Sequence, residues 1–256
     1  MLSTLRTLGI TVIILYVAIG IFLYLKQRSF LYFPTQNKVS TYPSIILENE
    51  EEKIQVLVLN KGKSHGLLYL GGNAESMASR ASEIEKQFPE ATVYLMDYRG
   101  FGGSTGEPTE KGLYSDALKL YDQVAPQHEQ ISVLGRSLGT GVATYVSVKR
   151  TVYKLALVTP YNSILALAQA QYPIYPIAWI LHDSYDSAKR VKDIEAKTLI
   201  VLAESDKVIP YKYSKTLIEA FGTKEMEVIT IKGTNHVNIT SNKDYDTVLK
   251  AFMKEE

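Results

Sequence analysis

Short apolar runs and amphipathic segments alternate along the chain from residue 53 to residue 231. Short apolar runs that end in turn-forming residues predict strands, and apolar residues at helical spacing predict helices. The predicted strands are Lys53–Leu59, Gly66–Leu70, Ala91–Met96, Ile131–Leu134, Lys154–Val158, Thr198–Leu202 and Glu227–Ile231. The predicted helices are Ser76–Phe88, Lys111–Val124, Leu138–Lys149 and Tyr211–Phe221. This alternation is typical of the α/β class and predicts a mostly parallel central sheet with helices on both faces.

The N-terminal segment has a different pattern, because no charged residue occurs from Thr7 to Leu25. A helix of this length, rising about 1.5 Å per residue, reaches roughly 28 Å, close to the hydrocarbon thickness of a bilayer. The alternative is a cleaved signal peptide, whose apolar core usually has about 7–15 residues and ends at small residues. Here Lys26 and Arg28 follow the apolar run closely. The pattern therefore favours an uncleaved, single-pass membrane anchor over residues 1–28.

The side of the membrane on which the rest of the chain lies is only weakly encoded. Arg6 and the α-amine flank one end of the apolar run, and Lys26 and Arg28 flank the other. Since cytoplasmic flanks carry an excess of Lys and Arg, these charges nearly balance. We expect the rest of the chain outside the cytoplasm. Residues 29–50 are interpreted as a connector, because Phe33-Pro34 and Tyr42-Pro43 interrupt a continuing helix.

Length and composition limit the number of domains, the kinds of partner and the kinds of site that we expect. The chain of 256 residues is long enough for one domain with a sizeable core, which we expect over residues 51–256. Its net charge of +1 gives no reason to expect a nucleic-acid partner. The chain has no cysteine, which excludes disulfides, thiolate metal sites and a cysteine nucleophile.

The sequence contains two matches to G-x-S-x-G, the pattern of a nucleophilic serine at a tight strand-to-helix turn. Gly135–Gly139 contains Ser137, and Gly102–Gly106 contains Ser104. Ser137 follows a predicted strand directly and precedes a predicted helix. Ser104 lies beyond its strand in a Gly-rich segment and is followed by Glu107-Pro108. The strand–turn–helix setting makes Ser137 the candidate nucleophile and Ser104 a loop residue.

A histidine and a carboxylate follow later strands of the same predicted sheet. His236 follows the last strand, where a general base can reach a serine at the carboxyl edge of the sheet. Asp206 follows the strand Thr198–Leu202 and can orient the imidazole, with Glu204 as a close competitor. The order Ser, Asp, His, with separations of 69 and 30 residues, is the order found in α/β-hydrolases.

Several motifs together give the chain a resemblance to a known family. They are Gly72–Ala74, Asp97–Gly102, Gly135–Gly139, Asp206–Pro210 and Asn235-His236. With these motifs the chain resembles, over roughly residues 50–250, the membrane-anchored α/β-hydrolase-domain proteins related to depalmitoylating thioesterases and serine aminopeptidase-like hydrolases.

The resemblance implies the α/β-hydrolase fold and a role for each site residue. Ser137 would be the nucleophile, Asp206 the acid and His236 the base. The backbone N–H groups of Asn73 and Leu138 would form the oxyanion hole. The chain departs from the family at Gly71-Gly72, where members often have His-Gly, and this difference concerns the support of the oxyanion loop.

The segment between Lys154 and Asp183 contains no Asp, Glu, Lys or Arg, and its part Ala166–Leu181 is apolar and aromatic. Pro173 and Pro176 interrupt this part, which argues against a second membrane span. One interpretation is a helix packed on the core. The other is a short lid near residues 160–187 whose inner face lines an acyl pocket.

Three functional hypotheses follow. The first is hydrolysis of carboxylic esters or thioesters with apolar acyl groups through an acyl-enzyme. The second is a peptidase, which would need acidic residues near the pocket to hold the substrate's ammonium group. The third is a catalytically silent binding protein on the same fold. The sequence shows no phosphate loop, metal-ligand cluster or dinucleotide fingerprint, so we expect no cofactor or metal, and it predicts no oligomeric state.

Overall fold

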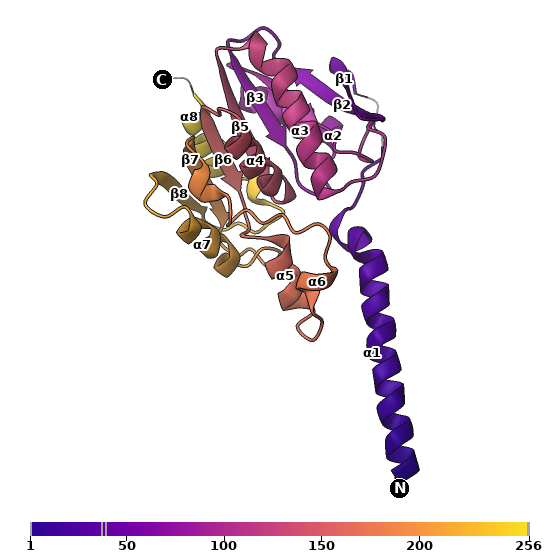
Figure 1. Cartoon of the computed structure of the whole chain (residues 1–256). Helices are drawn as coiled ribbons and strands as arrows, with labels where there is room; N and C mark the ends of the chain where they lie inside the picture. The colour runs from indigo at the N-terminus through magenta and orange to yellow at the C-terminus, as the bar shows by residue number, and fades with distance from the viewer. Residues whose placement is uncertain (1, 37, 39, 255–256) are drawn as a thin grey trace.

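The structure is a computed structural model that describes residues 2–36, 38 and 40–254. A mixed α/β domain carries at one side a long helix, α1 (Leu2–Leu31), which extends away from the domain (Figure 1). The chain enters the domain after α1 and ends, with helix α8, on the domain's far side. The protein thus has one globular part and one projecting helix.

The domain is built around a sheet of eight described strands. These are β1 (Ser44–Asn49), β2 (Glu52–Leu59), β3 (His65–Leu70), β4 (Ala91–Met96), β5 (Gln130–Arg136), β6 (Lys154–Val158), β7 (Lys197–Ala203) and β8 (Met226–Ile231). Their spatial order is β1-β2-β4-β3-β5-β6-β7-β8. The two pairs that involve β2 are antiparallel, and the strands from β4 to β8 pair in parallel. The predicted mostly parallel sheet is confirmed.

Helices cover both faces of this sheet. The α-helices after α1 are α2 (Met77–Gln87), α3 (Glu110–Val124), α4 (Leu138–Lys149), α5 (Ile164–Gln171), α6 (Ile177–Ile180), α7 (Tyr211–Ala220) and α8 (Lys243–Met253). Short 3-10 turns occur at Ala125–Gln127, Val191–Asp193 and Ile239–Ser241. The helices α3, α4 and α7 pack into one apolar cluster, and α2 and α8 pack into a second cluster on the other face. Strands β3, β4 and β6 are buried along their whole length between these layers.

Residues 29–50, expected to be a connector, include two regular elements. The helix α1 continues to Leu31, and β1 pairs along its length with β2. The sheet therefore begins at Ser44, before residue 51. In β1 only Leu47 is buried, because this strand lies at the edge of the sheet. An edge strand with one buried residue lacks the apolar run that identifies the inner strands.

Helix α1 is long and apolar enough to cross a membrane, and Leu23 is its only buried residue among those described. It contacts the segment that contains α5 and α6. The ring of Tyr16 stacks on that of Tyr175 with centroids 4.7 Å apart, and Leu23 packs against Tyr175 and Ile177. The helix is therefore a candidate membrane anchor that is also joined to the folded domain.

Candidate active site

Ser137 occupies the turn between β5 and α4, as the G-x-S-x-G pattern predicts. Its backbone has φ +49° and ψ −119°, a conformation that non-glycine residues rarely adopt. The Ser137 N–H donates to the carbonyl of Val158 (2.9 Å), and its carbonyl accepts from the Thr140 hydroxyl (2.7 Å). The surrounding structure thus holds a strained residue at the carboxyl end of the central strands.

The two glycines of the motif are required by packing. A Cβ atom at Gly139 would lie 2.0 Å from the carbonyl oxygen of Leu70, and one at Gly135 would lie 2.6 Å from the carbonyl oxygen of Gly139. Both neighbours are backbone atoms, one in β3 and one in α4, and neither can move aside without shifting its element. The absence of side chains at these positions allows α4 to start against the end of β3.

The structure brings Ser137, His236 and Asp206 together. His236 Nε2 lies 2.9 Å from Ser137 Oγ, and His236 Nδ1 lies 2.7 Å from Asp206 Oδ2. The other oxygen of Asp206 accepts from the N–H groups of Val208 (2.9 Å) and Ile209 (2.7 Å). These bonds fix the carboxylate after β7, so it faces the imidazole that follows β8.

The competing residues have other partners. Glu204 is exposed, and its carboxylate accepts from the Gly233 N–H (2.8 Å), so it supports the loop that leads to His236. Of the other histidines, buried His65 bonds to Ser132, half-buried His128 bonds to Tyr94, and His182 packs its ring against a tyrosine of α1. Each competing side chain has a structural role at its own position.

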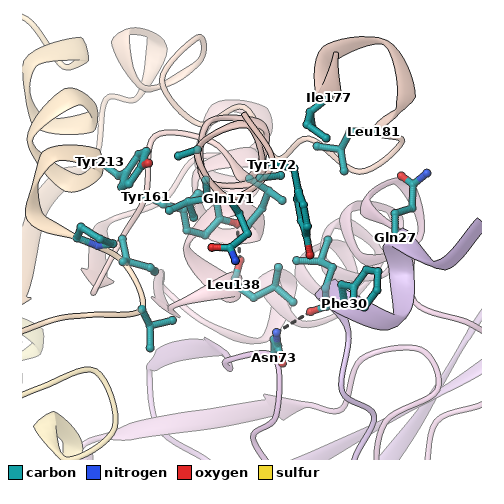
Figure 2. A pocket seen from close by; sticks show the side chains of 18 of the residues that line it. Gln27, Phe30, Asn73, Leu138, Tyr161, Gln171, Tyr172, Ile177, Leu181 and Tyr213 are labelled. Atoms are coloured by element: carbon teal, nitrogen blue, oxygen red, sulfur yellow. Dashed lines mark hydrogen bonds between the residues drawn. The ribbon is translucent and has the colours of Figure 1, made fainter. Parts of the chain in front are cut away.

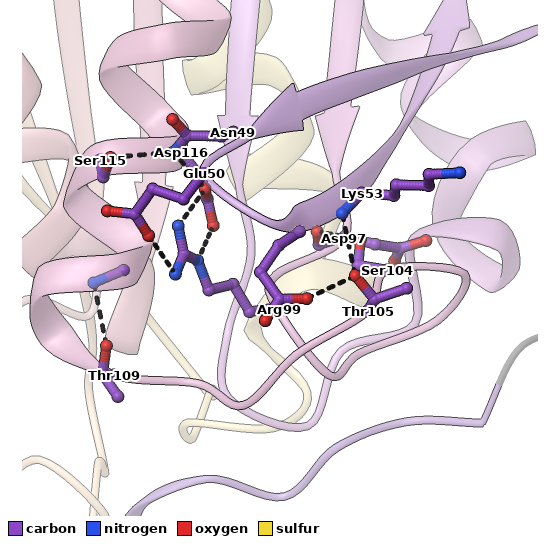
Figure 3. Close-up of polar contacts among 12 residues, drawn as sticks. Asn49, Glu50, Lys53, Asp97, Arg99, Ser104, Thr105, Thr109, Ser115 and Asp116 are labelled. Atoms are coloured by element: carbon purple, nitrogen blue, oxygen red, sulfur yellow. Dashed lines mark hydrogen bonds and ion pairs between the residues drawn. The ribbon is translucent and has the colours of Figure 1, made fainter.

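Ser104 lies in a loop at the antiparallel end of the sheet (Figure 3). Its hydroxyl donates to the carbonyl of Asp97 (2.7 Å) and accepts from the Gln55 N–H (2.9 Å). The neighbouring Thr105 hydroxyl accepts from the Lys53 N–H (2.9 Å). In the second G-x-S-x-G match, the hydroxyls of Ser104 and Thr105 therefore bond the loop to β2.

Burial raises the pKa of Asp97, beside this loop, to about 6, while the N–H groups of Gly103 and Met77 oppose the rise. Nearby, Arg99 forms two hydrogen bonds to the buried carboxylate of Asp116 (2.7 and 2.8 Å) and one to Glu50 (Figure 3). Through Arg99, the motif Asp97–Gly102 thus forms internal polar contacts with the middle of α3 and with the turn after β1.

The expected oxyanion loop passes directly beside Ser137. A Cβ atom at Gly72 would lie 3.6 Å from Ser137 Cβ, and Asn73, Ser137 and Leu138 line one cavity. The side chain of Asn73 donates a hydrogen bond to the carbonyl of Leu31 at the end of α1 (Figure 2). The loop is therefore attached to the candidate membrane anchor.

A buried carboxylate, that of Glu75, also supports this loop, and no motif of the sequence predicts its role. Glu75 accepts from the Gly72 N–H (2.8 Å) and forms ion pairs with Arg80 (3.2 Å) and Arg136 (3.4 Å). Arg136 also donates to the carbonyl of His236 (3.1 Å). This network joins the loop at Gly72 to the residue before Ser137 and to the loop that carries His236. It provides support where Gly71-Gly72 departs from the family pattern.

A cavity of about 510 Å³ extends from Ser137 between α1 and the segment that contains α5 and α6. Figure 2 shows Gln27 and Phe30 of α1 on one side of the cavity and Tyr213 on the other. None of the residues of α5, all of which the structure describes, is buried. Its half-buried Ile164, Ala166 and Leu167 pack against the core, and Ile164, Leu167 and Ala168 also line the cavity, so this helix lies between the core and the cavity. We call residues 160–187 the lid.

The charged side chains around the cavity are all basic among the described residues. Among the described residues that line it, Lys207 and Lys212 are charged and none is Asp or Glu. The other lining residues are mostly aliphatic or aromatic. Among the described residues no group of three or more His, Cys, Asp or Glu is placed to hold a metal ion. The arrangement can accommodate an apolar group next to the hydroxyl of Ser137.

Comparisons with known proteins agree with this fold. No family model matches the chain. An uncharacterized Mycobacterium tuberculosis protein, Rv2307c, is 28% identical over 90% of this chain and 88% of its own length. The chicken lysophosphatidylserine lipase ABHD12 is 30% identical over 83% of this chain, which spans 65% of that enzyme. The solved esterase Pf2001 of Pyrococcus furiosus has a TM-score of 0.67 at 15% identity, covering 86% of this chain and 98% of its own.

The sheet order, the turn at Ser137 and these likenesses define the class of protein: the chain has the α/β-hydrolase fold and is a hydrolase of that superfamily. Within the superfamily, it belongs to the α/β-hydrolase-domain family. The fold and family expected from the motifs are confirmed.

Proposed function

We propose that the protein is a membrane-anchored serine hydrolase that cleaves carboxylic esters or thioesters with apolar acyl groups. The hydrogen-bonded line from Ser137 Oγ through His236 to Asp206, at the floor of an apolar cavity, carries this proposal. Three side chains in this relation are the arrangement that activates a serine for acyl transfer.

The reaction begins with neutral His236, whose Nδ1–H donates to Asp206 while Nε2 accepts the hydroxyl hydrogen of Ser137. As Ser137 Oγ attacks the substrate carbonyl, its proton passes to Nε2. The backbone N–H groups of Leu138 and Asn73 would donate to the resulting oxyanion. The first turn of α4 adds partial positive charge.

Collapse of the tetrahedral intermediate breaks the bond to the leaving group, which takes the proton from His236 Nε2. An acyl ester on Ser137 remains. A water molecule then gives a proton to Nε2 and attacks this ester, and a second collapse returns the proton to Ser137 Oγ and frees the acid. Asp206 stays ionised and stabilises the imidazolium formed in each half.

The cavity favours an ester or thioester over a peptide substrate. An aminopeptidase needs a carboxylate to hold the substrate's ammonium group. Among the described residues that line the cavity, the charged ones are Lys207 and Lys212, and neither can do this. A relative named as a lysophosphatidylserine lipase and a fold neighbour named as an esterase support the same class. The lid gives the acyl group an apolar surface.

We also propose that α1 is an uncleaved anchor with the hydrolase domain outside the cytoplasm. Leu23, Gln27 and Phe30 of α1 line the cavity, so removing the helix as a signal peptide would open a wall of the site. Proteolysis of sealed inside-out vesicles tests the orientation. Protection of the domain supports the proposal, and digestion of the domain contradicts it.

The central experiment is labelling with a fluorophosphonate probe. The full-length protein should be labelled, Ser137→Ala should not, and Ser104→Ala should be labelled normally. Equal labelling of Ser137→Ala would reject the serine mechanism. Parallel assays with p-nitrophenyl acyl esters and amino-acid anilides then separate esterase from peptidase activity, and faster anilide hydrolysis would favour the peptidase.

A further inference from the structure

The lid and α1 meet in a surface that exposes large apolar side chains. We call it the anchor–lid face and define it as α1 from Tyr16 to Leu31 together with lid residues Tyr172–Leu181. On the lid side, Trp179 is 87% exposed and Ile174 is 70% exposed. Exposure of this degree at adjoining elements is typical of a surface that meets an apolar partner.

The lid reaches far along α1. The ring of Tyr175 stacks on that of Tyr16 in α1. Tyr16 lies nine residues before Leu25, where the uncharged run ends, and this separation corresponds to about 13 Å along the helix. A Cβ atom at Gly20 would lie 3.4 Å from the Tyr175 ring, at ordinary van der Waals distance, so the lid packs directly on α1 here. We call Tyr172–Leu181 the lid tip. If α1 spans a bilayer, the lid tip lies beside a part of α1 that is in hydrocarbon.

Several backbone groups in and next to the lid tip have hydrogen-bond partners within the protein, as they must where no water is present. The Tyr16 hydroxyl donates to the carbonyl of Ile174 (3.0 Å), and Gln169 donates to the carbonyl of Tyr175 (3.0 Å). Gln27 donates to the carbonyl of Ile180 (2.9 Å) and accepts from the His182 N–H (2.7 Å). In hydrocarbon no water replaces such partners, so irregular backbone is tolerated only when the protein supplies them.

Charges are absent from this part of the lid and return at its end. No Asp, Glu, Lys or Arg occurs between Lys154 and Asp183. Asp183, the first acidic residue after this stretch, forms an ion pair with Arg28 of α1 at 3.1 Å. Charged residues at the bilayer centre are costly, so this distribution places Arg28 and Asp183 at the membrane surface and the lid tip below it.

Part of this face, not including Trp179, also lines the cavity that leads to Ser137. Leu23 and Phe30 of α1 line the cavity together with Ile177 and Leu181 of the lid (Figure 2). We propose that the lid tip is immersed in the bilayer beside α1, and that the acyl chain of a membrane-resident ester lipid passes from the bilayer between α1 and the lid to Ser137. The chemistry at the end of this route rests on the proposed function.

Trp179 is the only tryptophan of the chain, so its fluorescence tests the immersion without any substitution. The full-length protein is reconstituted in phosphatidylcholine vesicles, with and without bromine on the acyl chains. We expect brominated chains to quench the emission and aqueous acrylamide to quench it weakly. Strong acrylamide quenching with no effect of bromine would place Trp179 in water and overturn the proposal.

A matched control moves the reporter to the opposite end of the domain. Ile46 is 51% exposed on the edge strand β1, away from α1 (Figure 1). In a double variant, Trp179→Phe with Ile46→Trp, we expect strong acrylamide quenching and no quenching by brominated chains. If this control and the native protein respond alike, the lid is not distinguished from a water-facing surface and the proposal fails.

The route is tested with two substrates: a long-chain ester lipid within phosphatidylcholine vesicles, and water-soluble p-nitrophenyl butyrate. Trp179 does not line the cavity. We expect Trp179→Asp to slow hydrolysis of the vesicle lipid at least about tenfold, because a charge resists burial in hydrocarbon, and to leave butyrate hydrolysis unchanged. Ile46→Asp should change neither rate.

The outcomes separate this proposal from the proposed function. Unchanged lipid hydrolysis in Trp179→Asp, or an equal loss on both substrates, would overturn the route. If the unaltered protein hydrolyses neither substrate, the proposed function fails. The fluorescence measurement would then still decide whether the lid tip is immersed.

Discussion

Two segments of this chain carry the same five-residue pattern and use it in opposite ways. In Gly135–Gly139 the serine has the unusual positive φ, and both glycines are needed because backbone atoms crowd them. In Gly102–Gly106 it is the glycines that have positive φ, +53° and +82°, and Ser104 bonds to the backbone on both sides. The pattern alone therefore does not identify a nucleophile. The two segments differ in that the positive φ, which strains any residue except glycine, falls on the serine only in Gly135–Gly139.

The largest expected difference between the segments is in catalysis. Ser137→Ala should lower ester hydrolysis by at least about 10⁴-fold, because no other group can form the acyl-enzyme. Ser104→Ala should leave kcat/KM within about twofold and cost roughly 1 kcal/mol of stability for its lost hydrogen bonds. Both are measured on the full-length protein in detergent micelles with a p-nitrophenyl ester. Equal losses in the two variants would remove the distinction.

The second prediction concerns Asp206, which bonds to the histidine next to Ser137. Asp206→Asn should lower kcat by about 10³–10⁴-fold, because an amide no longer stabilises the imidazolium or fixes its tautomer. Glu204→Gln is the matched control, since its side chain bonds to the Gly233 N–H and does not contact His236. Its kcat should change less than about threefold, as the amide oxygen can still accept that bond. A larger effect of Glu204→Gln would reverse the assignment of the acid.

Much of this site could be predicted from sequence because its signals are local. The run Ile131–Leu134, the glycines around Ser137 and the strand ends before Asp206 and His236 each depend on neighbouring residues. Helix α8, which was not predicted, also carried a usable signal. Its buried Tyr245, Leu249 and Phe252 follow helical spacing.

Other features depend on contacts between distant parts of the chain. Glu75 is one of many glutamates in the sequence, and only the folded chain surrounds it with Arg80 and Arg136. In the same way, the Asn73 side chain meets the carbonyl of Leu31 across 42 positions of sequence. No periodicity records such pairs. The edge strand β1 was missed for a different reason, since its single buried residue gives no pattern.

The third prediction tests whether the glycines of the two segments are needed for different reasons, close packing at Gly139 and positive φ at Gly106. Gly139→Ala should cost at least about 3 kcal/mol and abolish activity, because its Cβ would lie 2.0 Å from the carbonyl oxygen of Leu70. Gly106→Ala must adopt φ +82° and should cost about 1–2 kcal/mol with normal activity. Thermal unfolding in micelles, followed by circular dichroism, measures both. A mild effect of Gly139→Ala would show that the turn can relax.

The smallest expected effect is on the pH dependence of stability, and it arises only beside the Ser104 loop. Burial raises the pKa of Asp97 from 3.8 to about 6, so the folded protein holds this proton more tightly than the unfolded chain. Its contribution to stability is therefore complete below pH 4 and is lost as the pH rises through 6. One pKa unit corresponds to about 1.36 kcal/mol, which sets the loss at no more than about 3 kcal/mol.

Asp97→Asn, which cannot titrate, should flatten the decline in the unfolding temperature between pH 4 and pH 7. The Asp97 carboxylate accepts from the N–H groups of Gly103 and Met77 and has no bond to Ser137, so its titration should leave the fluorophosphonate labelling of Ser137 unchanged at equal folded fraction. A labelling rate that followed the Asp97 titration would mean that the two segments are coupled through β4, and the contrast between a catalytic turn and a structural loop would no longer hold.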